Sequence, residues 1–157
     1  RIILVNSEGH RFAAWGLRLD DLNWEKRRYS GLKSYGSAKL AQLQSILVFD
    51  EYFTDSGVTI NAMHPGAVRS ETGQENGAFY RWFKRNLYDK ILRPTEIASE
   101  SIYYLGVSKE MDGISGKFFN LTTEEEPAPP ALDKEAAYEI WAKSVEMTEV
   151  QDIIKKV

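Results

Sequence analysis

Short runs of apolar residues alternate along the chain with longer segments in which apolar side chains recur at helical spacing. Residues 2–5 are a continuous apolar run that ends at the polar segment 6–9, a pattern typical of a buried strand followed by a loop. Residues 58–62 alternate apolar and polar side chains before the His-Pro-Gly sequence at 64–66, which predicts a second strand. Residues 117–121 predict a third short strand.

Helices are predicted in four segments. From residue 34 to about residue 53, apolar side chains recur near helical spacing without an internal proline, so this is the longest predicted helix. Residues 78–92 form an aromatic and basic segment, and residues 95–106 begin with Thr95 as the predicted N-cap. An amphipathic helix is predicted over residues 133–147.

The order of these elements predicts an α/β fold with a parallel sheet, because a strand, a helix and a second strand joined in this way form a right-handed crossover. Residues 8–31 lack steady periodicity and are predicted to be loop and turn, and residues 124–130 an acidic, proline-rich linker. The carboxyl ends of parallel strands share one edge of the sheet, and ligands of open α/β folds bind there.

Composition narrows the class of protein. A chain of 157 residues with 43% hydrophobic and 27% charged residues is typical of one globular domain. Its acidic and basic residues are mixed and its net charge is -3, so we expect no nucleic-acid partner. The absence of cysteine excludes disulfides and thiolate chemistry. Neither a membrane span nor a signal peptide is recognisable, so we expect a cytoplasmic location.

The most informative pair of residues is Tyr35 and Lys39, which lie four positions apart at the start of the longest predicted helix. This spacing puts both side chains on one helix face, where an ammonium group lowers the pKa of a phenol and allows it to act as an acid or base. The small residues 36–38 would leave room for something flat against the helix. The alternative is a half-exposed tyrosine beside a solvated lysine.

The spacing alone is not specific, because Tyr29 with Lys33 and Tyr80 with Lys84 repeat it. The position of Tyr35 and Lys39 relative to the predicted sheet favours this pair as the catalytic one. Ser7 ends the first strand, and its hydroxyl could approach Tyr35 at the carboxyl edge of the sheet. The alternative role of Ser7 is to satisfy backbone groups where the strand ends.

Three ordered stretches carry a resemblance to a known family. They are residues 1–7 (Arg-Ile-Ile-Leu-Val-Asn-Ser), 35–39 (Tyr-Gly-Ser-Ala-Lys) and 61–70 (Asn-Ala-Met-His-Pro-Gly-Ala-Val-Arg-Ser). Together they resemble the short-chain dehydrogenase/reductase family, and its retinol-dehydrogenase-like branch in particular. The resemblance implies that residues 1–157 are the C-terminal part of a single domain with a Rossmann-like three-layer fold, whose nucleotide-binding half precedes Arg1.

The resemblance implies a role for each matching residue. Tyr35 would be the general acid or base, Lys39 would lower its pKa and bind the nicotinamide ribose, and Ser7 would donate to the substrate oxygen. The implied cofactor is NADP or NAD, and the choice between them cannot be read from this chain. The residues that would line the nicotinamide pocket, besides Tyr35 and Lys39, are Pro65, Gly66, Val68 and Ser70, the last of which stands where the family often has threonine.

The implied substrate is a small, lipophilic alcohol or carbonyl compound. By resemblance, the aromatic segment would cover it through Phe79, Trp82 and Phe83, although aromatic residues at helical spacing are also typical of a core. His10 is a further candidate substrate contact. Because His10 and His64 lack metal-ligand spacing, we expect no metal site, and structural roles are the alternative for both.

Two expectations concern assembly. The resemblance implies a possible homo-oligomer that pairs through residues 35–53 and 95–105. The first strand, residues 2–5, would expose an unpaired edge, which promotes association of the isolated chain.

The alternative to an oxidoreductase is a non-catalytic truncated fragment or partner-binding scaffold that lacks the nucleotide-binding half.

Overall fold

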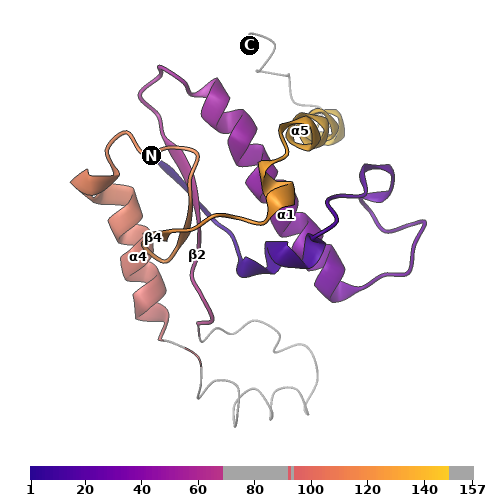
Figure 1. The fold of residues 1–157 in the computed structure, drawn as a ribbon, viewed down its shortest axis with the longest axis horizontal. Helices are drawn as coiled ribbons and strands as arrows, with labels where there is room; N and C mark the ends of the chain where they lie inside the picture. The colour runs from indigo at the N-terminus through magenta and orange to yellow at the C-terminus, as the bar shows by residue number, and fades with distance from the viewer. Residues whose placement is uncertain (69–91, 93, 149–157) are drawn as a thin grey trace.

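The computed structural model describes residues 1–68, 92 and 94–148 (Figure 1). Its centre is a four-stranded sheet in the order β1-β2-β3-β4. The strands are β1 (Ile2–Val5), β2 (Ile60–His64), β3 (Phe118–Asn120) and β4 (Thr123–Glu124). The first three are parallel, whereas β4 returns antiparallel to β3. The predicted parallel sheet is therefore confirmed, and β4, which the sequence did not predict, ends at the first residue of the predicted linker.

Two helices cover opposite faces of the sheet and complete a three-layer, Rossmann-like architecture (Figure 1). Helix α1 (Gly31–Tyr52) packs Leu40 and Leu43 against Ile60 and Ala62 of β2. On the other side, Met63 packs in a core with Leu105 of α4 (Thr95–Val107) and with Phe119. Alternate residues of β2 thus face the two helical layers, as the pleat of a strand requires.

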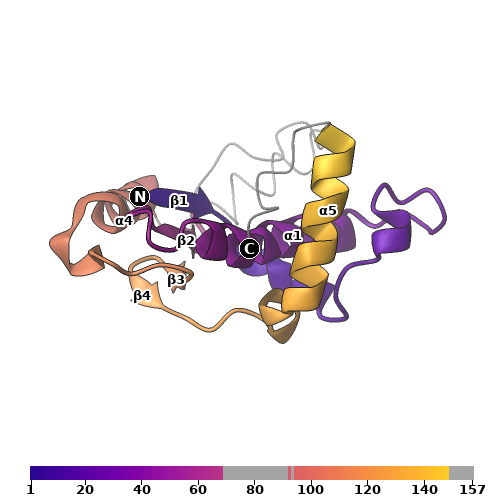
Figure 2. The ribbon, with the colours of Figure 1, turned by 90° about the horizontal axis from the view of Figure 1, so that it is seen from above.

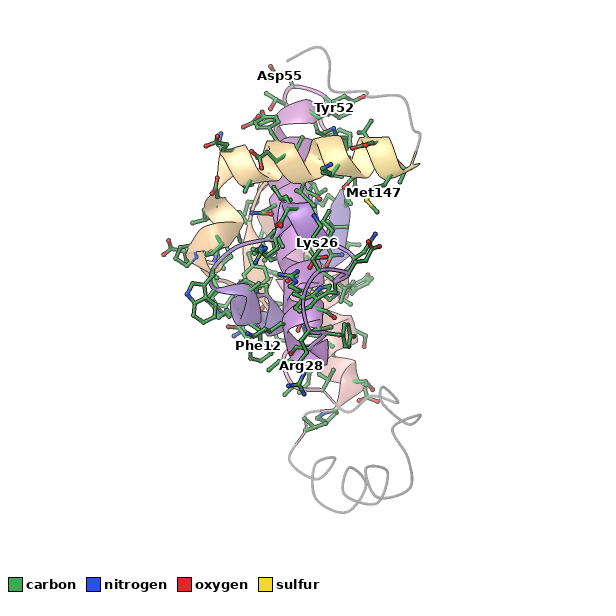
Figure 3. The ribbon with its side chains drawn as sticks, turned by 90° about the vertical axis from the view of Figure 1, so that its right-hand side faces the viewer. Phe12, Lys26, Arg28, Tyr52, Asp55 and Met147 are labelled. Atoms are coloured by element: carbon green, nitrogen blue, oxygen red, sulfur yellow. The ribbon has the colours of Figure 1, made fainter. Side chains whose placement is uncertain are left out.

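Helix α5 (Lys134–Thr148) crosses the outer side of α1 (Figures 2 and 3). The Trp141 ring meets Phe49 edge-on at 4.8 Å between centroids, and Lys134 pairs with Glu51 at 2.7 Å. Ala137 is buried in this contact region. Part of the face that the resemblance assigned to dimer formation is therefore covered by the chain's own last described helix.

The segment 8–31 is more ordered than its lack of periodicity predicts. It contains two 3-10 helices, η1 (Glu8–Ala13) and η2 (Leu19–Asp21). The buried Asp21 carboxylate accepts hydrogen bonds from the backbone N–H groups of Glu25 and Lys26, at 2.7 and 3.1 Å. Arg27 pairs with it at 3.3 Å and stacks on Trp24. A side-chain carboxylate thus supplies the order that hydrophobic spacing does not.

Element ends differ modestly from the predictions. Helix α1 begins at Gly31, and α4 has Pro94 rather than Thr95 at its N-cap, without a side-chain capping bond. Leu121 adopts a positive φ of 57°, which turns the chain from β3 into β4. Short 3-10 helices η4 (Lys109–Met111) and η5 (Pro129–Leu132) complete the described elements. The predicted helix 78–92 lies outside the described residues, apart from residue 92.

None of the helices in the described ranges is long and apolar enough to cross a membrane.

Candidate active site

The carboxyl ends of β1 and β2 meet the first turns of α1 at one edge of the molecule. Ser7 follows β1, the pair Pro65-Gly66 follows β2, and Tyr35 lies in the second turn of α1. Helix η1 runs directly from Ser7 and packs against α1, so the excursion 8–31 returns the chain to the same edge. Figure 3 shows Phe12 of η1 beside this end of α1, far from Tyr52 at the other end.

Ser7 and Tyr35 approach each other across Gly9. A β-carbon on Gly9 would lie 2.5 Å from Tyr35 Cε1 and 3.2 Å from Ser7 Oγ. The space is too small for any side chain, so glycine at this position is what permits the approach. The Tyr35 side chain remains 47% exposed, which leaves its phenol accessible from solvent.

The small residues after Tyr35 allow η1 to pack closely against α1, in addition to any room they leave for a ligand. A β-carbon on Gly36 would lie 2.8 Å from Phe12 Cβ and 2.9 Å from the Gly9 carbonyl oxygen. The room that the sequence predicts for a flat molecule is therefore occupied at Gly36 by the backbone and side chain of η1. This contact explains how η1 fixes Gly9, and with it Ser7, against the start of α1.

Lys39 lies one helical turn after Tyr35. Its ammonium nitrogen is 6.0 Å from the centroid of the Tyr35 ring, 3.3 Å from the Val5 carbonyl oxygen and 3.5 Å from Gln42 Oε1. An ammonium group carries three N–H donors, so these two acceptors leave one donor for another molecule. Lys39 thus connects α1 to the end of β1 and keeps hydrogen-bonding capacity.

Asn6, which the sequence alone does not mark as a site residue, sits between these groups. It is buried, and its amide nitrogen donates to the Lys39 carbonyl oxygen at 3.0 Å and to Gln42 Oε1 at 2.7 Å. Its side-chain oxygen accepts from the Ser7 backbone N–H at 2.7 Å. The available signal was a polar residue directly after an apolar strand, where a buried side chain needs polar partners.

Ser7 has a backbone role and retains a donor. Its Oγ accepts a hydrogen bond from the Gly9 N–H at 3.0 Å and caps η1. This is the strand-end role that the sequence left open as the alternative. A hydroxyl that accepts such a bond still carries its own proton for donation, so the cap is compatible with a role toward a substrate oxygen.

The residues predicted to line a nicotinamide pocket are only partly described. Pro65, Gly66 and Val68 are half-buried after β2, and Gly66 adopts a φ of 72°, which favours glycine. The other predicted residues lie outside the described ranges: Ser70, Phe79, Trp82 and Phe83.

The His10 ring is buried and bonds backbone groups through both nitrogens. Its side chain is completely buried, Nδ1 bonds the Ser7 carbonyl oxygen at 2.9 Å, and Nε2 accepts from the Ala128 N–H at 3.0 Å. Burial lowers the pKa of His10, which favours this neutral form. Because both ring nitrogens bond backbone groups, the structure gives His10 a structural place in contrast to the predicted substrate contact.

A group of charged and titratable side chains lies beside the same edge, and we call it the charge cluster: Glu8, Arg11, His64 and Glu125. His64 Nε2 is 3.2 Å from one oxygen of Glu8 and 3.7 Å from one oxygen of Glu125. Arg11 bonds the other oxygen of each carboxylate. Burial is the largest single influence on Glu125 and acts to raise its pKa, but the hydrogen bonds from Arg11 and Asn120 and the positive charge of Arg11 together outweigh it and hold that pKa below its usual range.

Three ligand atoms of the charge cluster lie close enough together to surround a metal ion. The hydrogen bonding of His64 argues against this use. Its Nδ1 accepts from the Gly66 N–H at 3.2 Å, so in the neutral ring the proton is on Nε2, which faces the two carboxylates. A metal would need the Nε2 lone pair. The contacts therefore fit a hydrogen-bonded ionic cluster better than a metal centre.

Comparison with known proteins identifies relatives. The chain is 34% identical over 151 residues to retinol dehydrogenase 13 of Homo sapiens, a match covering 94% of this chain and 45% of that protein. It is 31% identical to retinol dehydrogenase 14 of Homo sapiens, with 90% and 42% covered. It is 29% identical to the WW domain-containing oxidoreductase of Danio rerio, with 92% and 36% covered. The chain thus spans less than half the length of these curated relatives.

A solved structure supports the fold. A crystal structure of an uncharacterized protein from Mycobacterium paratuberculosis matches with a TM-score of 0.67 at 22% identity, over 96% of this chain and 50% of that one. No family model matches the chain.

Proposed function

We propose that this chain, which belongs to the retinol-dehydrogenase-like branch of the short-chain dehydrogenase/reductase family, carries the acid/base site of an oxidoreductase that interconverts an alcohol and a carbonyl compound. The observation that carries the proposal is the approach of the Ser7 hydroxyl to the Tyr35 ring across Gly9, with Lys39 one turn along the same helix. The relatives support the reaction class, because all three are named as dehydrogenases or oxidoreductases.

The residues at this edge fit a nicotinamide cofactor, which is NAD or NADP in this proposal. The free N–H donor of Lys39 suits a ribose hydroxyl, and the half-buried turn at Pro65-Gly66 follows β2 at the same edge of the sheet. Val68 follows this turn and belongs to the same proposed contact surface, to which the family resemblance adds Ser70. When bound there, the nicotinamide would supply a hydride to the substrate carbon or accept one from it.

Proton transfer falls to the chain's own residues. In the direction of reduction, Tyr35 donates its phenolic proton to the carbonyl oxygen, and in oxidation the phenolate takes the proton of the alcohol. The Ser7 hydroxyl donates a hydrogen bond to the same oxygen while negative charge develops on it. The Lys39 ammonium group stabilises the phenolate that forms when the proton leaves.

Exposed apolar side chains around Tyr35 favour a lipophilic substrate. Leu32 precedes Tyr35 by three residues on α1, so both lie on one helix face, and both are exposed. Phe12 is likewise exposed, and it lies beside Gly36 in the next position of the helix. The names of the relatives, retinol dehydrogenases 13 and 14, point to the same substrate class.

The test compares two tyrosines in the same spacing to lysine. Tyr35→Phe removes the proposed proton donor, so turnover of retinal with NADH or NADPH should fall about 10²- to 10⁴-fold. Tyr29→Phe is the matched control, because Tyr29 also precedes a lysine by four positions but packs edge-on against Trp24 and accepts a hydrogen bond from Ser34. It should keep turnover within about twofold. Equal activity of both variants would reject the proposal.

Cofactor binding separates this function from the scaffold alternative. The proposal expects saturable binding of NADH or NADPH, measured by the fluorescence of the reduced nicotinamide. Tyr35→Phe should retain that binding. Lys39→Met should weaken it because a ribose contact is lost. A chain that binds neither nucleotide and turns over no carbonyl compound would favour the non-catalytic scaffold.

A further inference from the structure

We propose that Asn6 is the residue that positions Ser7 and Lys39 relative to each other, an inference that rests on the proposed function. The buried amide of Asn6 is the link, because it bonds the Ser7 backbone on one side and the Lys39 backbone on the other. Ser7 comes from the end of β1 and Lys39 from α1, so these two elements have to be aligned for the site to exist.

On the strand side, Asn6 is held in two ways. Its backbone N–H donates to the Met63 carbonyl oxygen at 2.7 Å, which fixes it to β2. Its side-chain oxygen accepts from the Ser7 N–H at 2.7 Å, which fixes the direction in which the chain leaves the strand. Ser7 therefore starts η1 from a backbone position that the Asn6 side chain determines.

On the helix side, the two N–H groups of one amide reach two acceptors. The Lys39 carbonyl oxygen is at 3.0 Å and Gln42 Oε1 is at 2.7 Å. Gln42 Oε1 also lies 3.5 Å from the Lys39 ammonium nitrogen. Asn6 thereby orients the Gln42 amide so that its oxygen, and not its nitrogen, faces the ammonium group.

Only an amide can make this set of bonds at position 6. Serine has one hydroxyl donor and cannot reach both acceptors, and an ionised aspartate keeps the acceptor for Ser7 but has no donor. Because proton transfer and cofactor contact depend on sub-ångström placement, loss of these bonds should be visible in turnover. Asn6 itself touches no substrate in this proposal, so its role is positioning and not catalysis.

The experiment uses two variants and a matched control on the same helix. Asn6→Leu removes both donors and the acceptor with a side chain of similar shape and adds no charge, whereas Gln42→Met removes the acceptor that faces the ammonium group. Gln44→Met is the control, because Gln44 is buried on α1 and donates to the Pro130 carbonyl oxygen at 2.9 Å. Three readouts are compared: turnover of retinal, the unfolding midpoint, and the rate and pH profile with which a trace amine-acylating reagent labels Lys39.

The proposal predicts about ten- to a hundredfold lower turnover per folded molecule for Asn6→Leu and Gln42→Met. It also predicts faster Lys39 labelling in both variants, because the Gln42 oxygen is no longer held against the ammonium group in Asn6→Leu and is absent in Gln42→Met. Gln44→Met should lower the unfolding midpoint and leave the labelling profile unchanged.

A purely structural role for Asn6 would lower the unfolding midpoint of Asn6→Leu and leave the Lys39 labelling profile as in the wild type, and this result would overturn the proposal. The labelling measurement needs no turnover. An inactive wild type would therefore reject the proposed function, while labelling would still decide whether Asn6 positions Lys39.

Discussion

Ser7 and Glu8 are neighbours in the chain, yet they belong to two regions of opposite character. Around Ser7, the reactive groups keep unused capacity: its hydroxyl proton, the exposed Tyr35 phenol and one N–H of Lys39. Around Glu8, Arg11 bonds both carboxylates of the charge cluster, and the buried Nε2 of His64 faces both without making a hydrogen bond. The first region is open to a ligand, and the second is closed in the sense that its carboxylates are already paired.

The difference teaches that residue type alone does not locate the chemistry. His64 and two glutamates are the more familiar catalytic or metal-binding set, but Arg11 already bonds both carboxylates and His64 Nδ1 already accepts from the Gly66 N–H. Serine, tyrosine and lysine are less conspicuous, but they keep donors free and lie at one edge of the sheet. A candidate site in this fold is therefore recognised by polar groups that remain uncommitted.

The largest expected effect comes from breaking the approach in the open region. In Gly9→Ala the new methyl group would overlap the Tyr35 ring and push it away from Ser7. We expect turnover to fall about 100-fold and the free energy of unfolding to fall by about 1–3 kcal/mol. Retinal turnover and urea unfolding measure the two effects.

The control for Gly9→Ala is Gly106→Ala. Gly106 lies in α4, where a β-carbon would meet no atom within 4 Å, so the change should leave turnover unchanged and stabilise the helix by up to about 1 kcal/mol. Normal turnover of Gly9→Ala would mean that Ser7 and Tyr35 need not approach across this position.

A smaller effect on stability is expected from pH, because the buried His10 takes up a proton more readily in the unfolded chain than in the folded one. Burial holds the pKa of His10 in the folded protein below the usual 6.5. The unfolded chain therefore takes up this proton at higher pH than the folded one, so the free energy of unfolding should decrease as pH falls below about 6.5. Urea unfolding at a series of pH values measures the slope.

His10→Gln isolates the contribution of this group, since glutamine keeps an acceptor for the Ala128 N–H but takes up no proton. The slope just below pH 6.5 should become shallower in the variant. The carboxyl groups with lowered pKa are Asp20, Glu51 and Glu125, and their protonation destabilises the protein only below their usual values of 3.8 and 4.5, outside this window. Identical slopes in variant and wild type would assign the pH dependence to another group.

The smallest effect is expected from opening the closed region. Arg11→Met removes the side chain that bonds Glu8 and Glu125, both of which are partly exposed to solvent. Solvent screening limits the loss of unfolding free energy to about 1 kcal/mol, and high salt should reduce the difference between variant and wild type. Turnover should stay within about twofold. A loss of turnover as large as that of Gly9→Ala would show that the two regions are not separate.

Local periodicity predicted most of the fold. The apolar run at residues 2–5, the helical spacing after residue 34 and the alternation at residues 58–62 depend on near neighbours in sequence, and each became the expected element. The first residue of α4 was harder to predict, because Thr95 has the residue type of an N-cap but Pro94 occupies that position. Strand β4 depends on the positive φ of Leu121, which no glycine marks.

The candidate site residues could be named from the sequence, but the contacts that hold them could not be predicted from it. Ser7, Tyr35 and Lys39 could be named from motifs, and the structure brings them to one edge. The need for glycine at positions 9 and 36 comes from contacts between η1 and α1 that have no sequence period. The bond between His10 and Ala128 joins residues 118 positions apart and is equally invisible to local pattern.

The most direct test of the open and closed regions is a map of backbone amide NMR shifts of this chain as NADH, NADPH and a retinal analogue are added. The account predicts that the largest shifts occur at Ser7, Tyr35, Lys39 and Gly66, with smaller ones at Glu125 and Ala128. Shifts confined to the charge cluster, or no shifts at any of these residues, would contradict it.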